Sequence, residues 1–262
     1  MPSSLVASMC RQAESRSEEF KPQDIANTLW ALATAGEPMS SSLVVSMCRQ
    51  AESISEEFKP QAISITLWAA CVSRQAASFD AVIAALLTRL VDQGWSNYTE
   101  HAQASGQLHQ CLLSLQHETP QLKSSVILSQ GHLDDLAEHC RKEFTAQSHH
   151  GSPSKLQRQV AAVLRQVLTA DCVEVLEEQV PEGCGGYSVD VLLRGLPGRP
   201  RVVVEVDGPS HFVGQHLTGS TQLKHRLLRA MGWEVVQVPY FEWPKGKEQR
   251  ASYVRTALQL VD

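Results

Sequence analysis

The sequence predicts a protein with two kinds of structure, an N-terminal α-solenoid of helix-pair repeats and a small C-terminal α/β domain. Three observations support this division. A segment of the chain occurs twice, at residues 3–23 and 41–61. Apolar residues then keep helical spacing to about residue 147, and runs of β-branched residues of strand length appear only beyond that point. We therefore expect residues 1–77 to form two helical repeats, 78–147 a helical extension, and 148–262 the α/β domain.

The composition is that of an ordinary globular protein. The chain has 262 residues, of which 43% are hydrophobic and 19% charged, with a net charge of -5. An acidic balance argues against binding nucleic acid through bulk charge, although it does not exclude local basic patches. No apolar run approaches the ~20 residues of a membrane-spanning helix, so no membrane partner is expected. The seven cysteines include no CxxC pair, which argues against a disulfide framework or a zinc site and favours a reducing compartment.

Each copy of the repeat divides into two amphipathic helices. The copies are offset by 38 residues, and residues 3–23 differ from 41–61 at two positions, Ala7/Val45 and Arg16/Ile54. The second helix of the first copy is expected to begin at Pro22, because proline is tolerated in the first turn. Helix pairs of this kind cannot bury their apolar faces alone and stack into a solenoid. Residues at equivalent positions are expected in the core, namely Met9/Met47, Cys10/Cys48 and Trp30/Trp68.

The middle of the chain continues the helical pattern. Residues 78–147 contain further apolar stripes, such as Val82, Leu86 and Leu90. The 38-residue period decays here, so we interpret this segment as a helical extension, with a degenerate third repeat as one reading. A polar stretch rich in Gly, Pro and Ser at residues 147–154 marks the expected start of the α/β domain.

The C-terminal domain has the predicted order helix, three strands, helix, strand, helix. Ser154 is a candidate N-cap of the first helix, and Thr218 opens the second, which Gly232 ends. This order predicts a small sheet with helices on its faces. The expected strands are residues 173–176, 187–193, 201–207 and 233–239, and the closing helix is 247–260.

The strand at residues 201–207 ends in two carboxylates. Glu205 and Asp207 are followed at once by Gly208 and Pro209, which stop the strand. Period-two alternation places both acids on one face. Two neighbouring carboxylates at a sheet end are costly unless they hold a cation or cap another group, and both alternatives stay open from these residues.

The repeat carries the motif FKPQDIANTLWALA at residues 20–33, and much of it recurs in the second copy. This pattern resembles the octotricopeptide repeat, a 38-residue helix pair common in organelle RNA-binding proteins of green algae. In proteins that read one base per repeat, variable polar positions contact successive bases. The copies diverge at Asp24 and Asn27, where the second copy has Ala62 and Ile65. The resemblance implies RNA contacts at Asp24 and Asn27, with neutral divergence as the alternative.

A dense set of motifs lies between residues 202 and 260. It includes EVDGPSHF at 205–212, TGST at 218–221 and GWEVV at 232–236. Together with Asp190, these motifs resemble the RAP domain, which is frequent at the C-termini of organelle RNA-processing proteins. Such a domain after such repeats implies an RNA-binding regulator of the processing, stability or translation of organelle transcripts. Its expected partners are single-stranded RNA and other organelle RNA-processing proteins. Its expected location is the chloroplast or the mitochondrion, with the chain truncated and its transit peptide missing.

The RAP domain is in turn similar to the restriction-endonuclease-like PD-(D/E)xK fold, which includes very-short-patch-repair nucleases. In that fold two acids on neighbouring strands hold Mg²⁺ and a lysine orients the attacking water. Asp190 and Glu205 match the two acids, whereas Asp207 occupies the lysine position. The resemblance implies a catalytic group of Asp190, Glu205, Asp207 and Lys224, in which Lys224 reaches in from the next helix. The three carboxylates are the candidate Mg²⁺ ligands, and a Mg²⁺-dependent endonuclease is the alternative to an RNA binder.

Cations and aromatic residues also cluster in the last two helices and the segment between them. Such a mixture suits phosphate contact and base stacking on single-stranded RNA. A solvated helix face with buried tryptophans is the structural alternative, and a protein-interaction scaffold is a third possible function. The candidate RNA-binding residues of this domain are His211, Lys224, Arg226, Arg229, Trp243 and Lys245.

Overall fold

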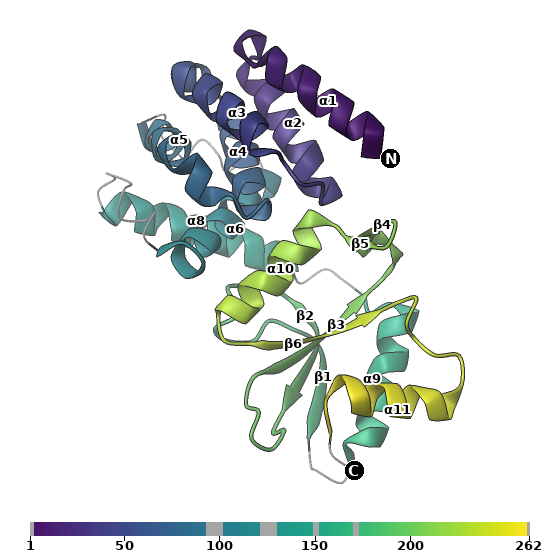
Figure 1. Cartoon of the computed structure of the whole chain (residues 1–262). Helices are drawn as coiled ribbons and strands as arrows, with labels where there is room; N and C mark the ends of the chain where they lie inside the picture. The colour runs from purple at the N-terminus through teal and green to yellow at the C-terminus, as the bar shows by residue number, and fades with distance from the viewer. Residues whose placement is uncertain (1–2, 93–101, 121–129, 149–151, 170–172, 261–262) are drawn as a thin grey trace. The chain divides into compact units, whose positions relative to one another are not determined.

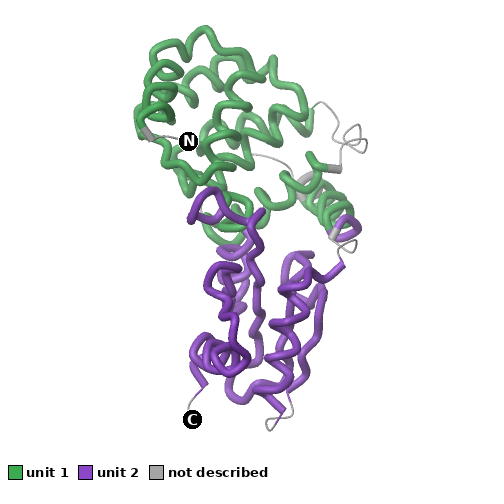
Figure 2. The backbone as a smooth tube through the Cα atoms, turned by 90° about the vertical axis from the view of Figure 1, so that its right-hand side faces the viewer, with its two compact units in different colours: residues 1–144, 218–223 green, residues 145–217, 224–262 purple. Residues whose placement is uncertain are grey.

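The structure is a computed structural model that describes residues 3–92, 102–120, 130–148, 152–169 and 173–260. The chain divides into two compact units, which Figure 2 shows in different colours. The first unit contains residues 1–144 with 218–223, and the second contains 145–217 with 224–262. Residues 149–151, in the predicted boundary stretch, lie outside the described residues. Among the helices of the described ranges, none combines the length and apolar character that a membrane span requires.

The first unit is built from α-helices (Figure 1). They are α1 (Ser3–Ser15), α2 (Pro22–Ala35), α3 (Ser41–Ser53), α4 (Pro60–Val72), α5 (Asp80–Asp92), α6 (Ala102–His117) and α8 (Gln130–Ser148). The helices α2 and α4 both begin at a proline, as the repeat pattern predicted. Helix α1 packs beside α3, and α2 beside α4, so the two repeats stack on each other. The helical class predicted for this part of the chain is therefore confirmed.

The two copies of the repeat bury the same side chains to different extents. Met47 and Trp68 are 0% and 5% exposed, whereas Met9 and Trp30 are 59% and 40% exposed. The prediction that equivalent residues share the core is therefore wrong for these two residues of the first copy. The reason lies in their neighbours, because α4 also packs against α6, where Gln110 Oε1 accepts a 2.6 Å hydrogen bond from Trp68 Nε1.

The second unit contains a four-stranded mixed sheet in the order β1-β2-β3-β6. Its elements are α9 (Lys155–Val167), β1 (Glu174–Gln179), β2 (Val189–Arg194), β3 (Val202–Asp207), α10 (Gly219–Ala230), β6 (Glu234–Pro239) and α11 (Lys247–Ala257), with a short hairpin of β4 (Phe212–Val213) and β5 (His216–Leu217). Strands β1, β2 and β3 pair antiparallel, while β3 and β6 are parallel. A parallel pair needs a crossover, and α10 supplies it. The predicted order of elements and the α/β class are confirmed.

The central strand β3 is buried along its whole length. Figure 1 shows α9 and α11 on one face of the sheet and α10 on the other. Val202, Val204 and Val206 join the core beneath α9 and α11. The alternate residues of β3, including Glu205 and Asp207, therefore project toward α10. The fold in this way carries two carboxylates into a buried layer beside a helix.

Candidate functional site

Asp190 ties β2 to β3 at the point where their pairing stops. The backbone register between the two strands ends at Val191 and Val204. One residue beyond, Asp190 Oδ2 accepts a 2.6 Å hydrogen bond from the Val206 amide. Burial raises the pKa of Asp190, while Lys224 and the Val206 amide act in the opposite direction. The carboxylate therefore continues the strand pairing and also carries charge into the site.

Gln157 supports Asp190 from α9. Its side chain forms a capping box with Ser154, the predicted N-cap, whose Oγ accepts the Gln157 amide at 3.0 Å. The Gln157 Nε2 atom donates to the Asp190 carbonyl at 3.0 Å and to Glu178 Oε1 at 2.8 Å. A buried carboxamide thus joins the start of α9 to two strands of the sheet.

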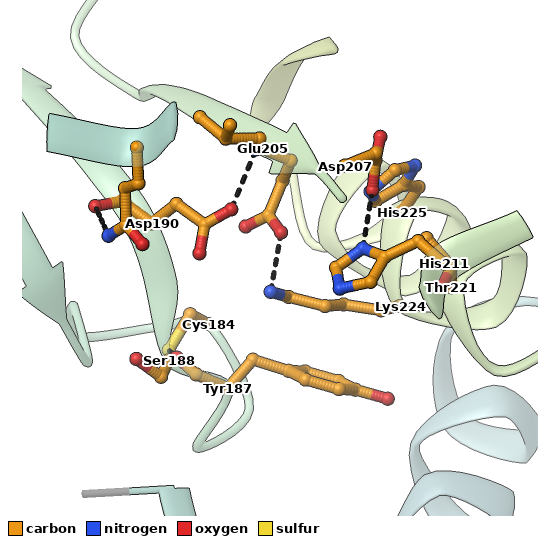
Figure 3. Close-up of polar contacts among 12 residues, drawn as sticks. Cys184, Tyr187, Ser188, Asp190, Glu205, Asp207, His211, Thr221, Lys224 and His225 are labelled. Atoms are coloured by element: carbon orange, nitrogen blue, oxygen red, sulfur yellow. Dashed lines mark hydrogen bonds and ion pairs between the residues drawn. The ribbon is translucent and has the colours of Figure 1, made fainter. Parts of the chain in front are cut away.

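Glu205 and Lys224 form a buried ion pair. Glu205 is 1% exposed, and its Oε2 atom lies 2.5 Å from Lys224 Nζ. Burial raises the pKa of Glu205 to about 7, although Lys224 lowers it. Burial alone would lower the pKa of Lys224, but Glu205 and Asp190 together outweigh burial and raise it. Figure 3 shows the carboxyl groups of Asp190 and Glu205 directed toward each other above Lys224. The structure thus brings together three of the four predicted catalytic residues.

Asp207 lies apart from this group and contacts two histidines. Its side chain is fully buried, and its Oδ1 atom lies 2.9 Å from His211 Nδ1 and 3.6 Å from His225 Nε2. The hydrogen bond to Asp207 raises the pKa of His211, which stays partly exposed. Burial lowers the pKa of His225 to about 4, so this ring is neutral at pH 7. Asp207 therefore holds His211 by a hydrogen bond. The positive charge next to Glu205 comes from Lys224 instead.

The predicted three-carboxylate cation site is divided by this arrangement. The described part of the chain holds no group of three or more His, Cys, Asp or Glu side chains that could hold a metal ion. Asp190 and Glu205 remain as a two-carboxylate group, and the buried Glu205 Oε1 has no hydrogen-bond partner. Mg²⁺ is often held by one or two carboxylates together with water and phosphate oxygens. The pair therefore fits Mg²⁺, with Lys224 competing for the other oxygen of Glu205.

An aromatic cluster lies immediately beyond the ends of β3 and β6. Phe212, Tyr240 and Phe241 contact one another edge to face, with ring centroids 5.1 to 5.7 Å apart. Tyr240 and Phe241 are 40% and 49% exposed. Tyr240 and Phe241 belong to the aromatic residues that the sequence places beside the last two helices, although Trp243 alone was named as a candidate contact. Tyr240 and Phe241 directly follow the strand-ending Pro239.

Trp243, the predicted aromatic contact for RNA, is less exposed than Tyr240 and Phe241. Its ring is half-buried, packs on Tyr253 with centroids 5.8 Å apart, and lies 5.6 Å from the Arg250 guanidinium carbon. The indole N–H donates to Gln159 Oε1 at 3.3 Å. These contacts fix Trp243 between α9 and α11 as part of the framework.

The predicted cations of this domain have different surroundings. Arg229 Nη2 donates to the Val235 carbonyl at 3.3 Å, and Lys224 is paired with Glu205. Arg226 is half-buried on α10, while Lys245 is exposed. Lys245 is therefore the best placed of the four to meet a phosphate from solvent.

The predicted repeat contacts, Asp24 and Asn27, are exposed on the first turns of α2. Asp24 Oδ2 accepts the Lys21 amide at 3.0 Å, which caps the helix. Asn27 Oδ1 accepts a 2.9 Å hydrogen bond from Gln23 Nε2. Both side chains thus have local partners that involve no ligand.

The C-terminal part of the chain is similar to known proteins. Residues 204–257 match the RAP domain family. A chloroplastic RAP domain-containing protein of Oryza sativa subsp. japonica is 36% identical over 78 residues, which cover 28% of this chain and 11% of that protein. The mitochondrial FAST kinase domain-containing protein 3 of Bos taurus is 38% identical over 64 residues, covering 24% of this chain and 8% of that protein.

The matched segments are therefore about a tenth of the length of these relatives. Their names support the expected location in a chloroplast or mitochondrion. The matched region contains Glu205, Asp207, Lys224 and the whole aromatic cluster. Residues 204–257 of this chain form a RAP domain.

Proposed function

We propose that this protein binds single-stranded RNA in an organelle and regulates the processing, stability or translation of transcripts there. The aromatic cluster of Phe212, Tyr240 and Phe241 is the observation that carries the proposal. Large aromatic rings exposed to solvent at a strand end are costly unless they meet a ligand. Every base offers a π-face, so such rings bind unpaired bases with little sequence preference.

Phosphate contact beside the cluster is assigned to His211 and Lys245. His211 precedes Phe212, and its bond to Asp207 raises its pKa, which favours the cationic form near neutral pH. Lys245 is exposed and follows the cluster by four residues. With so few cations and a net charge of -5, we expect a shallow dependence of affinity on salt.

The helical repeats are assigned the role of an additional RNA surface of the octotricopeptide type. Asp24 and Asn27 are the residues that would contact bases, because they are exposed at the start of α2 and differ between the copies. Two repeats would read at most a couple of bases. Other organelle RNA-processing proteins are the proposed partners that would supply further specificity.

Fluorescence anisotropy with a labelled, unstructured oligoribonucleotide tests this function. Tyr240→Ala and Phe241→Ala should each weaken binding about tenfold, because one stacked base contributes about 1–3 kcal/mol. Val213→Ala is the matched control, since Val213 is 41% exposed nearby but has no ring. Unchanged affinity in both aromatic variants would refute stacking at this cluster.

The grouping of Asp190, Glu205 and Lys224 favours a second candidate, Mg²⁺-dependent cleavage of a phosphodiester bond. The two carboxylates would hold the cation, which when bound would polarise the phosphate and lower the pKa of a coordinated water. Lys224 would carry positive charge next to the scissile phosphate. Glu205→Gln keeps the shape of the side chain but removes its charge. Cleavage that requires Mg²⁺ and disappears in Glu205→Gln would establish this activity, and intact RNA with wild-type protein would exclude it under those conditions.

A further inference from the structure

Strand β6 forms an open edge of the sheet. It is last in the strand order, and among the described strands it pairs with β3 alone. The side chains of Val235, Val236 and Val238 are already buried within the chain, so the open part of the strand is its backbone edge, and such edges are normally covered or paired. A groove of about 530 Å³ runs along this edge, with Gln237 on one wall and Tyr253 of α11 among its lining residues.

The backbone of β6 presents an ordered set of hydrogen-bonding groups to this groove. The Glu234 and Tyr240 amides donate to carbonyls on the β3 side at 2.8 and 2.9 Å, so the even-numbered residues face β3. By alternation, the N–H and C=O groups of Val235 and Gln237 point outward. Arg229 already binds the Val235 carbonyl. Pro239, at the third outward position, has no N–H, and its carbonyl already accepts the Glu242 amide of its own chain at 3.0 Å.

We propose that β6 is a homodimer interface, in which two copies of the chain pair their β6 strands antiparallel about a two-fold axis at Gln237. In this register the two Gln237 residues exchange both of their hydrogen bonds. Each Val235 amide donates to the Pro239 carbonyl of the other copy, which also accepts the Glu242 amide of its own chain. The Val235 carbonyl would face the N–H that proline lacks, and Arg229 satisfies that carbonyl from within its own chain. The register therefore leaves no outward amide or carbonyl of Val235 or Gln237 unpaired.

Charge along the groove also fits a second copy. Arg229 precedes β6 and Glu242 follows it, and both line the groove. Antiparallel pairing brings the start of one strand against the end of the other, so Arg229 of each copy meets Glu242 of its partner. Because of the two-fold axis, the Arg229–Glu242 pair would form twice in the dimer. A single foreign peptide strand would need its own matching charges at both ends.

Sedimentation velocity of the full chain across a dilution series tests the interface. We expect a concentration-dependent dimer. Arg229→Glu and Glu242→Arg should each raise the dissociation constant about tenfold or more, because like charges then meet. The double variant should bind more tightly than either single variant, because the charges match again, although the bond from Arg229 to the Val235 carbonyl stays lost. Lys245→Glu makes the same charge change as Arg229→Glu outside the groove and should have no effect. A monomer at every concentration, or a double variant no better than the singles, would overturn the proposal.

Cross-linking tests the register. In an antiparallel hydrogen-bonded pair the opposed Cα atoms lie about 5.5 Å apart, which suits a disulfide. Gln237→Cys should therefore form an interchain disulfide under mild oxidation, and Lys245→Cys, exposed but off the axis, should not. Gln237→Pro removes the outward N–H without touching the bonds to β3 and should abolish the dimer. A dimer that persists in Gln237→Pro, or one that Gln237→Cys does not cross-link, would place the interface elsewhere.

Discussion

The two units differ in what they bury. Among the described residues of the helical unit, the buried polar side chains other than His109 are small hydroxyl side chains, namely Ser17, Ser64, Thr66, Ser105 and Ser114. The α/β unit instead buries Gln157, Glu205, Asp207 and His225. Buried ionisable groups are costly and concentrate at functional sites. The contrast indicates that the buried ionisable groups of the described residues are concentrated in the α/β unit, while the core of the helical unit is mainly apolar packing.

The largest effect on stability should come from opening a cavity in the core of the helical unit. Phe58 is fully buried, so Phe58→Ala should destabilise the helical unit by about 3–5 kcal/mol by opening a cavity. Phe20 is its equivalent in the first copy and is only half-buried, so Phe20→Ala should cost clearly less. Urea unfolding followed by circular dichroism measures both. Equal losses would mean that the two copies are packed alike in solution.

The next largest effect on stability should come from breaking the buried ion pair between Glu205 and Lys224. Lys224→Met should cost about 3 kcal/mol at pH 8, because Glu205 then stays buried without its partner. Adding Glu205→Gln should recover most of the loss, since no charge remains to be paired. The comparison is a double-mutant cycle on urea unfolding. A double variant as unstable as the single would show that Lys224 acts through packing rather than charge.

The dependence of stability on pH should separate two buried groups. Burial raises the pKa of Glu205 from 4.5 to about 7, so its contribution to stability falls as pH rises through this window. Burial lowers the pKa of His225 from 6.5 to about 4, so its contribution falls as pH drops from 6.5 toward 4. For each group the shift corresponds to about 3 kcal/mol of stability.

Thermal unfolding in metal-free buffer measures the two contributions against the wild-type profile. Glu205→Gln should make the protein relatively more stable at high pH. His225→Gln should make it relatively more stable at low pH. Parallel profiles for all three proteins would show that neither group is held in an uncharged form.

The smallest effect concerns the start of α2. Asp24→Ala should cost about 0.5–1 kcal/mol, because Asp24 accepts the Lys21 amide in the capping box. The second copy has Ala62 at this position and provides an internal reference. Anisotropy on the same variant shows whether Asp24 also contacts RNA. A large loss of affinity with a small loss of stability would show that Asp24 contacts RNA.

Much of the fold could be predicted because periodicity reports which face of an element is covered. The prolines at the starts of α2 and α4 and the valine run of β3 were sufficient to define those elements. The exposure of Met9 could not be predicted, because it depends on what packs against the first repeat and not on the repeat itself. Identical side chains therefore differ in burial although the local sequence is nearly the same, with Ala7 in one copy and Val45 in the other.

The site was predictable only in part. The approach of Lys224 to Glu205 was expected from a resemblance, and the geometry agrees with it. The pairing of Asp207 with His211 depends on the turn between them, which sets the direction of each side chain. The burial of His225 was not among the expectations, because no sequence motif marks it; adjacent helix residues point about 100° apart, so its direction does not follow from that of Lys224.

The bond between Asp190 and the Val206 amide limits how this protein can be tested genetically. The carboxylate replaces a rung of the β2–β3 pairing, so removing it loosens the sheet whether or not RNA or metal is bound. An alanine at this position would confuse loss of structure with loss of activity. Asparagine keeps an oxygen that can accept from the Val206 amide while removing the charge. Asp190→Asn is therefore the allele that separates the two roles, and a phenotype seen with alanine but not with asparagine would be architectural.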